Sequence, residues 1–230
     1  MKITDVEAIV LRQAEVNEGI ADGSQDDLVV RIHTDEGITG IGEVDSSPEL
    51  VQALVQAPSS HAVAVSLRDV LIGEDPLDVE RLWQKMYRGL IYFGRRGIAI
   101  HAISGLDIAL WDIKGKYHGV PAYQLLGGPV RDRIRVYAHA SGDTIETFIQ
   151  RANEQIALGF TALKTSFSGP VREIDTPAFV KRCVEKIAAI RGGIPDHVDL
   201  AVDLHGRFSP AMAIRLAKEY EVDGIIQYDL

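Results

Sequence analysis

Cysteine is almost absent from this sequence, since Cys183 is the only one in 230 residues. A lone cysteine cannot form an internal disulfide, so nothing in the sequence points to an oxidising, secreted setting. Cys183 lies within a run of helical periodicity, from Phe179 to Ile187. We therefore expect it to fill the core rather than to act as a nucleophile.

Basic residues are scarce relative to acidic ones. The sequence has 24 Lys and Arg against 33 Asp and Glu, which gives a formal net charge of −9. The absence of a basic patch argues against nucleic acid and against an anionic membrane surface as partners. No apolar run approaches the ~18 residues that span a bilayer, and the first residues lack the apolar core of a signal peptide. We expect a cytoplasmic protein.

Glycine-rich phosphate loops are missing as well. No Gly-x-Gly-x-x-Gly and no Gly-Lys-Ser/Thr sequence follows an expected strand, which disfavours a phosphate or dinucleotide enzyme. Hydrophobic residues make up 46% of the chain and charged residues 25%, an ordinary share for a folded protein. The chain is long enough for one large domain or two small ones.

Residues 1–128 predict a small α+β domain. Alternating apolar residues indicate strands at 3–11, 27–33 and 37–44, the last two joined as a hairpin. Polar residues and glycine at 12–25 indicate a mobile loop.

Helices dominate the rest of this first part. Helical periodicity indicates one helix after Ser47-Pro48, one over 77–87, and a long one that ends near Lys116. The long helix contains three polar residues that we interpret as ordinary helical side chains rather than as ligands: His101, Asp107 and Asp112.

Residues 129–230 predict a different organisation, in which strands and helices alternate. Strands are expected at 134–141, 160–166 and 199–205, with a fourth beginning at 224, and helices at 144–158, 176–191 and 209–220. Strand–helix units that recur in this way predict right-handed βαβ crossovers and a parallel sheet. The predicted fold class is therefore α/β, with an α+β domain followed by parallel β/α units.

The third of these strands carries the most informative residues. An apolar run from Leu200 brings Asp203 and His205 to the carboxyl end of the strand, before Gly206. Ligands and catalytic groups collect at this end of parallel strands, and residues two apart on a strand share a face. A carboxylate can hold a hard cation, and a neighbouring imidazole can move a proton. The alternative is that Asp203 caps the following turn and that His205 is an ordinary loop histidine.

Several motifs resemble the enolase superfamily, in its mandelate racemase and muconate-lactonizing branch. They are Thr34-Asp-Glu-Gly-Ile-Thr-Gly-Ile-Gly-Glu43, Ser104-Gly-Leu-Asp-Ile-Ala-Leu-Trp-Asp-Ile-Lys-Gly115 with Pro121-Ala-Tyr-Gln-Leu-Leu-Gly-Gly128, Gly159-Phe-Thr-Ala-Leu-Lys-Thr-Ser166, and Val202-Asp-Leu-His-Gly-Arg207. The last motif resembles sugar-acid dehydratases of the galactonate and mannonate type. The resemblance covers essentially the whole chain and implies a capping domain over 1–128, followed over 129–230 by the first part of a TIM-type (β/α) barrel. About three units and a partial fourth are present, so the barrel is incomplete in this chain.

The resemblance also implies a lyase that removes the proton α to a sugar-acid carboxylate through an enediolate held by Mg²⁺. It makes Asp203 the first of three carboxylate metal ligands and His205 the acid that protonates the departing β-hydroxyl. Lys164 takes the first place of the family's Lys-x-Lys pair, where it could bind the substrate carboxylate or lower the pKa of a neighbouring group. The alternative is that Lys164 only pairs with a carboxylate of the barrel. Ser166 stands at the second place and cannot serve as the usual base. Arg207 is a candidate for binding the substrate carboxylate, with a surface salt bridge as its alternative.

The remaining implied groups are not assigned to this chain. The family's other metal ligands and its usual His–Asp base pair belong to later strands, and Asp229 is not assigned. We therefore expect the chain alone to be inactive, as a piece of a larger assembly or a truncated product. The alternatives are a non-catalytic assembly module of the same fold, or a racemase or cycloisomerase.

The resemblance names partners too. The loop at 12–25 corresponds to the segment that closes over the substrate and reads its hydroxyls. The expected partners are a small-molecule sugar acid and further copies of this chain, in a homo-oligomer, or a second chain that supplies the rest of the barrel.

Overall fold

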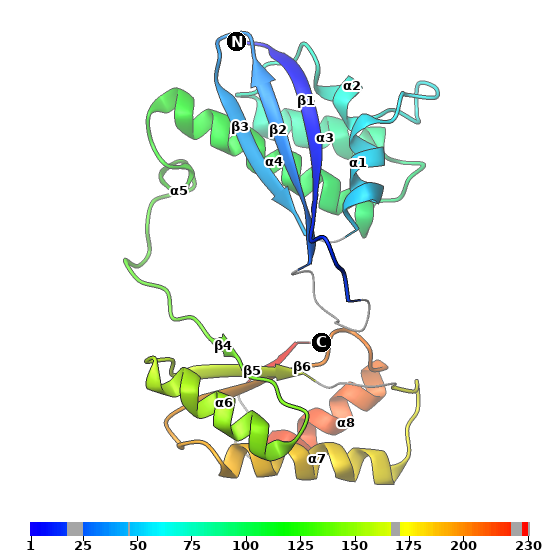
Figure 1. The fold of residues 1–230 in the computed structure, drawn as a ribbon. Helices are drawn as coiled ribbons and strands as arrows, with labels where there is room; N and C mark the ends of the chain where they lie inside the picture. Colours follow the sequence, from blue (N-terminus) through cyan, green and yellow to red (C-terminus); the bar gives the residue numbers. More distant parts are fainter. Residues whose placement is uncertain (18–24, 46, 167–170, 222–226, 230) are drawn as a thin grey trace. The chain divides into compact units, whose positions relative to one another are not determined.

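The computed structural model describes residues 1–17, 25–45, 47–166, 171–221 and 227–229 (Figure 1). The chain divides into two compact units, Met1–Val130 and Arg131–Leu230, and each is described by itself. In the described part, no helix is long and apolar enough to cross a membrane.

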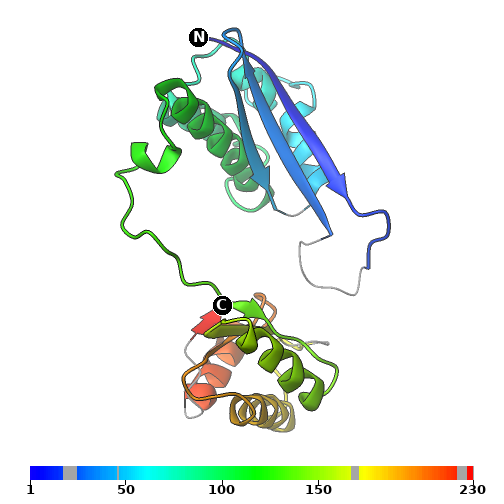
Figure 2. The same ribbon diagram turned by 60° about the vertical axis from the view of Figure 1, so that its left-hand side comes forward.

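The first unit is built on an antiparallel sheet of three strands in the order β1-β2-β3. β1 spans Ile3–Arg12, β2 spans Asp26–Thr34 and β3 spans Thr39–Val44. On β2, alternate residues such as Leu28 and Val30 are buried, and helices cover that face of the sheet (Figure 2). The predicted strands and hairpin are confirmed because this alternation is complete.

Five helices accompany the sheet in the described part of this unit: α1 (Pro48–Gln56), α2 (Leu67–Leu71), α3 (Val79–Gly89), α4 (Ile98–His118) and α5 (Ala122–Leu125). The sequence predicted α1, α3 and α4 but not α2 and α5, whose five and four residues are too few to show a period. α3 begins two residues later than expected, because the Asp75 carboxylate accepts the Leu77 N–H at 3.0 Å and holds the chain in a turn there.

β3 lies directly on α4 because glycines remove the side chains between them. A Cβ atom at Gly42 would overlap the carbonyl oxygen of Gly105, and one at Gly40 would overlap that of Ala109. At Gly105, a Cβ atom would in turn overlap the side chain of Val44. Gly40 and Gly42 of β3 and Gly105 of α4 are therefore required, because any side chain there would keep the two backbones apart.

Side chains of α4 also satisfy the open edge of β3. The Asp112 carboxylate accepts the Ile41 N–H at 2.9 Å, and the Lys116 ammonium donates to the Thr39 carbonyl at 2.7 Å. Lys116 and Asp112 are themselves ion-paired at 2.7 Å. Asp112 is thus a structural group, as the sequence analysis expected, and it blocks pairing of this edge with another strand.

Asp107 is a second structural carboxylate on α4. Burial holds the pKa of Asp107 above its usual value, the nearby Glu80 of α3 adds to this effect, and a hydrogen bond from Trp111 opposes it.

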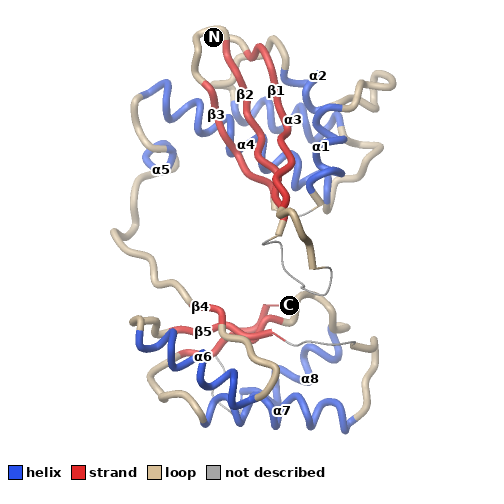
Figure 3. Tube along the Cα trace, viewed as in Figure 1, coloured by secondary structure: helices blue, strands red, loops and turns tan. Residues whose placement is uncertain are grey.

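The second unit contains a parallel sheet of four strands in the order β4-β5-β6-β7. The strands are β4 (Ala138–His139), β5 (Ala162–Ser166), β6 (Asp199–Asp203) and β7 (Gln227–Asp229), and the helices are α6 (Ile145–Ala157), α7 (Pro177–Gly192) and α8 (Pro210–Glu221). The three helices lie on one side of the sheet (Figure 3). Leu163, Thr165, Leu200 and Val202 are buried on that side. We call the opposite side, which carries Lys164 and Asp203, the helix-free face of the described part.

The predicted β/α alternation is confirmed, and Cys183 is buried on α7 as core. Thr144 and Thr176 cap α6 and α7, since their side chains accept the N–H groups of Thr147 and Phe179.

β4 is much shorter than the predicted strand over 134–141. The Arg135 guanidinium donates to the Thr161 carbonyl at 2.6 Å and to the Thr161 hydroxyl at 3.0 Å, and it is ion-paired with Asp199. The Thr161 carbonyl, just before β5, thus accepts both from the Arg135 side chain and from the Asp199 N–H, at 3.0 Å. Ile134 and Val136, on either side of Arg135, are exposed.

Replacing Gly42 with alanine is expected to lower the free energy of unfolding of the first unit by about 3 kcal/mol, because the new methyl group overlaps the α4 backbone. Both tryptophans of the chain, Trp83 and Trp111, lie in this unit, so urea denaturation followed by tryptophan fluorescence reports on it selectively. Glu43→Ala, at an exposed residue of the same strand, is the control and should leave the midpoint nearly unchanged. An unchanged midpoint for Gly42→Ala contradicts the close packing of β3 on α4.

Candidate active site

Asp203 is the last residue of β6, and its carboxylate shapes the turn that follows. The Asp203 Oδ1 atom accepts the backbone N–H of His205 at 2.8 Å, and the Arg207 N–H donates to the Leu204 carbonyl at 3.2 Å. His205 and Gly206 both adopt left-handed backbone conformations, with φ of 52° and 61°. This is an Asx turn, the capping role that the sequence analysis kept as an alternative.

The prediction that Asp203 and His205 share a strand face is wrong, because the strand ends at Asp203 and His205 lies in the turn. The turn nevertheless brings the two side chains together. The His205 Nδ1 atom lies 3.4 Å from Asp203 Oδ1. The left-handed conformation costs a non-glycine residue free energy, and the Asp203 carboxylate helps to hold it.

Lys164 joins the same cluster from the neighbouring strand. In the parallel register, Lys164 is opposite Ala201 and Ser166 is opposite Asp203. The Lys164 ammonium reaches along the sheet and donates to Asp203 Oδ2 at 2.9 Å. Only 17% of the Lys164 side chain and 7% of the Asp203 side chain are exposed, so this is a largely buried ion pair.

The two partners hold each other in their charged forms. Burial raises the pKa of Asp203, but hydrogen bonds from Lys164 and from the His205 backbone more than offset it, and the pKa lies below its usual value. For Lys164, the hydrogen bond to Asp203 raises the pKa above its usual value against the effect of burial. A general base needs a pKa near the working pH, so Lys164 in this arrangement is a fixed cation.

Tyr137 is a residue of this cluster that the sequence analysis missed. The Lys164 Nζ atom lies 5.2 Å from the centroid of the Tyr137 ring. His139 is the register partner of Lys164, and Tyr137 lies two residues before His139. Alternation along an extended chain could therefore have placed Tyr137 and His139 on the same face of the sheet. That signal was weak because the segment before β4 is not a regular strand.

Two further predicted positions lie near the cluster. Ser166 ends β5 and is exposed. Arg207 is partly buried in the turn after β6, and its proposed contact with the substrate carboxylate stays a prediction.

The described residues fit one position of a metal site. Asp203 offers an ionised carboxylate at the carboxyl end of a parallel strand, which suits a hard divalent cation. Its register partner on β7 is Asp229, whose side chain lies outside the described part. Among the described residues, no group of three or more His, Cys, Asp or Glu could hold a metal ion. The described part therefore supplies one ligand and not a complete site.

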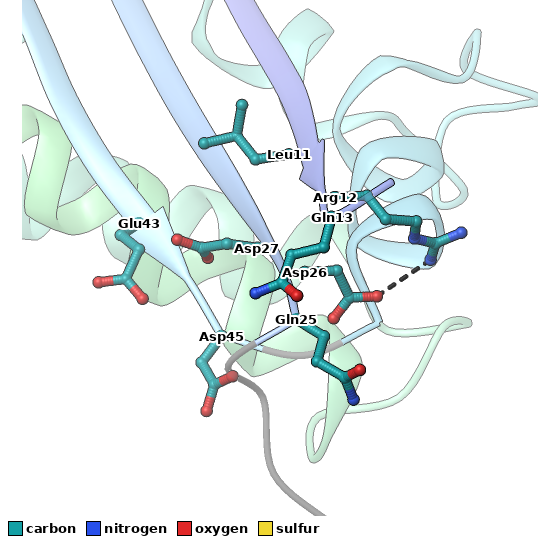
Figure 4. A pocket seen from close by; sticks show the side chains of 8 residues that line it. All are labelled: Leu11, Arg12, Gln13, Gln25, Asp26, Asp27, Glu43 and Asp45. Carbon is teal, nitrogen blue, oxygen red and sulfur yellow. Dashed lines mark hydrogen bonds and ion pairs between the residues drawn. The ribbon is translucent and has the colours of Figure 1, made fainter. Parts of the chain in front are cut away.

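A separate cavity of about 400 Å³ lies in the first unit, where the three strands end (Figure 4). Its lining is acidic, with Asp26, Asp27, Glu43 and Asp45 against one guanidinium, that of Arg12. The predicted loop at 12–25 begins and ends at this cavity, although residues 18–24 lie outside the described part. Carboxylates are poor partners for an acid group but good acceptors for hydroxyl groups.

Comparisons with known families match both units. Residues 16–127 match the family described as "Mandelate racemase / muconate lactonizing enzyme, N-terminal domain". Residues 147–226 match the family described as "Enolase C-terminal domain-like".

Two curated relatives carry the same name. The chain is 40% identical over 194 residues to a D-galactonate dehydratase of Xanthomonas axonopodis, and 42% identical over 196 residues to one of Verminephrobacter eiseniae. Each match covers 84% of this chain and 49% of the relative. The chain therefore spans about half the length of the curated relatives it matches.

Solved structures agree on the fold. A mandelate racemase/muconate lactonizing enzyme-like protein from Rubrobacter xylanophilus aligns with a TM-score of 0.80 at 30% identity, over 99% of this chain and 59% of that one. The 3,6-anhydro-D-galactonate cycloisomerase from Zobellia galactanivorans aligns with a TM-score of 0.79 at 28% identity, over 99% and 58%.

Replacing Lys164 with methionine is expected to lower the free energy of unfolding of the second unit by about 3 kcal/mol, because the Asp203 carboxylate is then buried without its cation. The double variant with Asp203→Asn should lose clearly less than the sum of the two single variants. Far-UV circular dichroism during denaturation provides all four values of this cycle.

Lys181→Met is the matched control for this cycle. Lys181 forms an exposed pair with Glu185 at 3.6 Å on α7, so its replacement should change the free energy by about 0.5 kcal/mol or less. Additive effects of Lys164→Met and Asp203→Asn show that the two side chains do not act as a pair.

Proposed function

The chain belongs to the mandelate racemase and muconate lactonizing enzyme branch of the enolase superfamily, and on that premise we propose that it carries part of the active site of a metal-dependent sugar-acid dehydratase. The observation that carries this proposal is the cluster of Lys164, Asp203 and His205 at the carboxyl ends of two adjacent parallel strands. The relatives named D-galactonate dehydratase support an aldonic acid as the substrate.

Asp203 is proposed as a ligand of a divalent cation, Mg²⁺ in the first instance. The low pKa keeps its carboxylate ionised over the neutral range, and the Asx turn fixes its orientation. A bound cation supplies positive charge that stabilises the carboxylate of the substrate as the neighbouring proton leaves.

Lys164 is proposed to bind the substrate carboxylate. Its ammonium is charged and lies on the helix-free face, 2.9 Å from the proposed ligand oxygen. An acid group that meets both the cation and Lys164 is oriented by two charges.

His205 is proposed to protonate the departing β-hydroxyl. Its imidazole is partly exposed, and its backbone position is fixed by the left-handed turn and by Asp203. An imidazole is the side chain that most often transfers a proton in general acid catalysis.

The missing ligands lead to a proposal about assembly. Because the described part supplies one metal ligand, we propose that activity requires further ligands from residues outside that part or from a second chain.

A cycloisomerase acting on a related sugar acid is the second candidate. The structural similarity to the Zobellia galactanivorans cycloisomerase supports it. The dehydratase is preferred because His205 offers an acid for a leaving hydroxyl, and because the curated relatives share that activity by name.

The test is the formation of a 2-keto-3-deoxy acid from D-galactonate and other aldonic acids with Mg²⁺, followed by the absorbance of its semicarbazone. The 230-residue chain is assayed alone, and together with the part of the Verminephrobacter eiseniae enzyme that it does not match. We expect product only in the second case. Asp203→Asn and His205→Asn should each reduce turnover by at least about 10²-fold.

Matched controls lie in one exposed loop before β6. Asp196→Asn and His197→Asn make the same chemical changes at exposed residues and should leave turnover within about twofold. Absence of product from every acid in both forms rejects the dehydratase, and full activity of Asp203→Asn rejects its role as a ligand.

A further inference from the structure

Lys164 has two kinds of partner in the cluster, and they differ in charge. Asp203 is an anion at 2.9 Å, whereas Tyr137 offers an aromatic ring whose centroid lies 5.2 Å from the ammonium, and its side-chain hydrogen bond also helps to raise the pKa of Lys164. The Tyr137 ring is itself in contact with the His139 ring, at a centroid distance of 5.7 Å and an angle of 52°. All of these side chains belong to β5, β6 and the segment that leads through β4.

A cation that binds Asp203 changes this balance. The Asp203 Oδ2 atom cannot be the main partner of Lys164 and of a divalent ion at the same time, and the ion repels the ammonium. Without another partner, the long side chain of Lys164 would turn away into solvent. The face of an aromatic ring attracts an ammonium and does not compete for a metal ion that prefers oxygen ligands.

We propose that Tyr137 is a positioning residue for Lys164, which keeps the ammonium on the helix-free face when the Asp203 carboxylate is taken up by another cation. The inference deepens the proposed function, on which its significance for substrate binding rests. It assigns a role to the segment just before β4, and it explains why an aromatic side chain lies beside a lysine that already has a buried carboxylate partner.

The experiment observes Lys164 directly in the 230-residue chain, by NMR of protein with ¹³Cε-labelled lysine. Asp203→Asn removes the charge of the competing partner, as a bound cation does, and keeps an oxygen for the His205 N–H. In this background we compare Tyr137→Phe, which keeps the ring, with Tyr137→Leu, which removes it. Lys164→Arg assigns the signal.

The upfield ring-current shift of the Lys164 ε-protons, and the ordering of its Cε atom, should persist in Asp203→Asn and in Asp203→Asn/Tyr137→Phe. In Asp203→Asn/Tyr137→Leu both should fall to the values of Lys181, an exposed lysine. Tyr123→Leu, at an exposed tyrosine of the first unit, is the matched control and should change neither. If Asp203→Asn does not fold, Asp203→Ser takes its place in the same comparison, since it also removes the charge and keeps an oxygen for the His205 N–H.

Loss of the shift in Asp203→Asn alone, or a Lys164 Cε atom that stays ordered in Asp203→Asn/Tyr137→Leu, overturns the inference. The measurement needs neither metal nor substrate, so a failure of the dehydratase assay rejects the proposed function without deciding this result. In an active assembly, Tyr137→Leu should raise KM for the sugar acid about tenfold and change kcat less than twofold, whereas Tyr137→Phe should restore KM. Equal changes in the two constants, or no rescue by phenylalanine, contradict positioning.

Discussion

The ion pair between Lys164 and Asp203 is the interaction on which the candidate site depends. It joins two adjacent strands at 2.9 Å, and it lets a carboxylate that is 7% exposed stay ionised. Burying such a pair costs desolvation free energy, which is offset only when the two charges are well aligned and make additional hydrogen bonds. Here the His205 backbone provides the additional bond, and the same bond places the imidazole of His205. One buried charge thus organises the ammonium, the turn and the histidine.

The packing of the first unit depends on a different constraint, the presence of glycines where a strand lies against a helix. Gly40 and Gly42 allow β3 to lie on the backbone of α4, and the Asp112 and Lys116 side chains then close the free edge of the strand. This fixes the hairpin whose end lines the acidic cavity. The motifs that first suggested the superfamily are therefore structural in the first unit, whereas those of the second unit carry the candidate chemistry.

Periodicity predicted most of the fold because both sheets bury alternate residues against helices. It failed at two strand ends: β4 contains only Ala138–His139 of the predicted 134–141, and β6 ends at Asp203, which caps a turn before His205. For the site, the strand pattern singled out Asp203 and His205, and motif resemblance added Lys164, but their contacts depend on strand register, which no local pattern contains. Tyr137 was missed because it lies just before β4, and its contact with Lys164 joins segments far apart in the sequence.

The most direct test of the account is a titration with Mn²⁺, which replaces Mg²⁺ at oxygen-rich sites and has an electron paramagnetic resonance signal when free. The titration uses the chain assembled with the complementary part of the Verminephrobacter eiseniae enzyme. The account predicts tight binding of about one Mn²⁺ per site, unchanged in Asp196→Asn and at least about tenfold weaker in Asp203→Asn. Equal affinity of the Asp203→Asn and unsubstituted proteins would contradict the claim that Asp203 is a metal ligand, and with it the organisation of the site around that carboxylate.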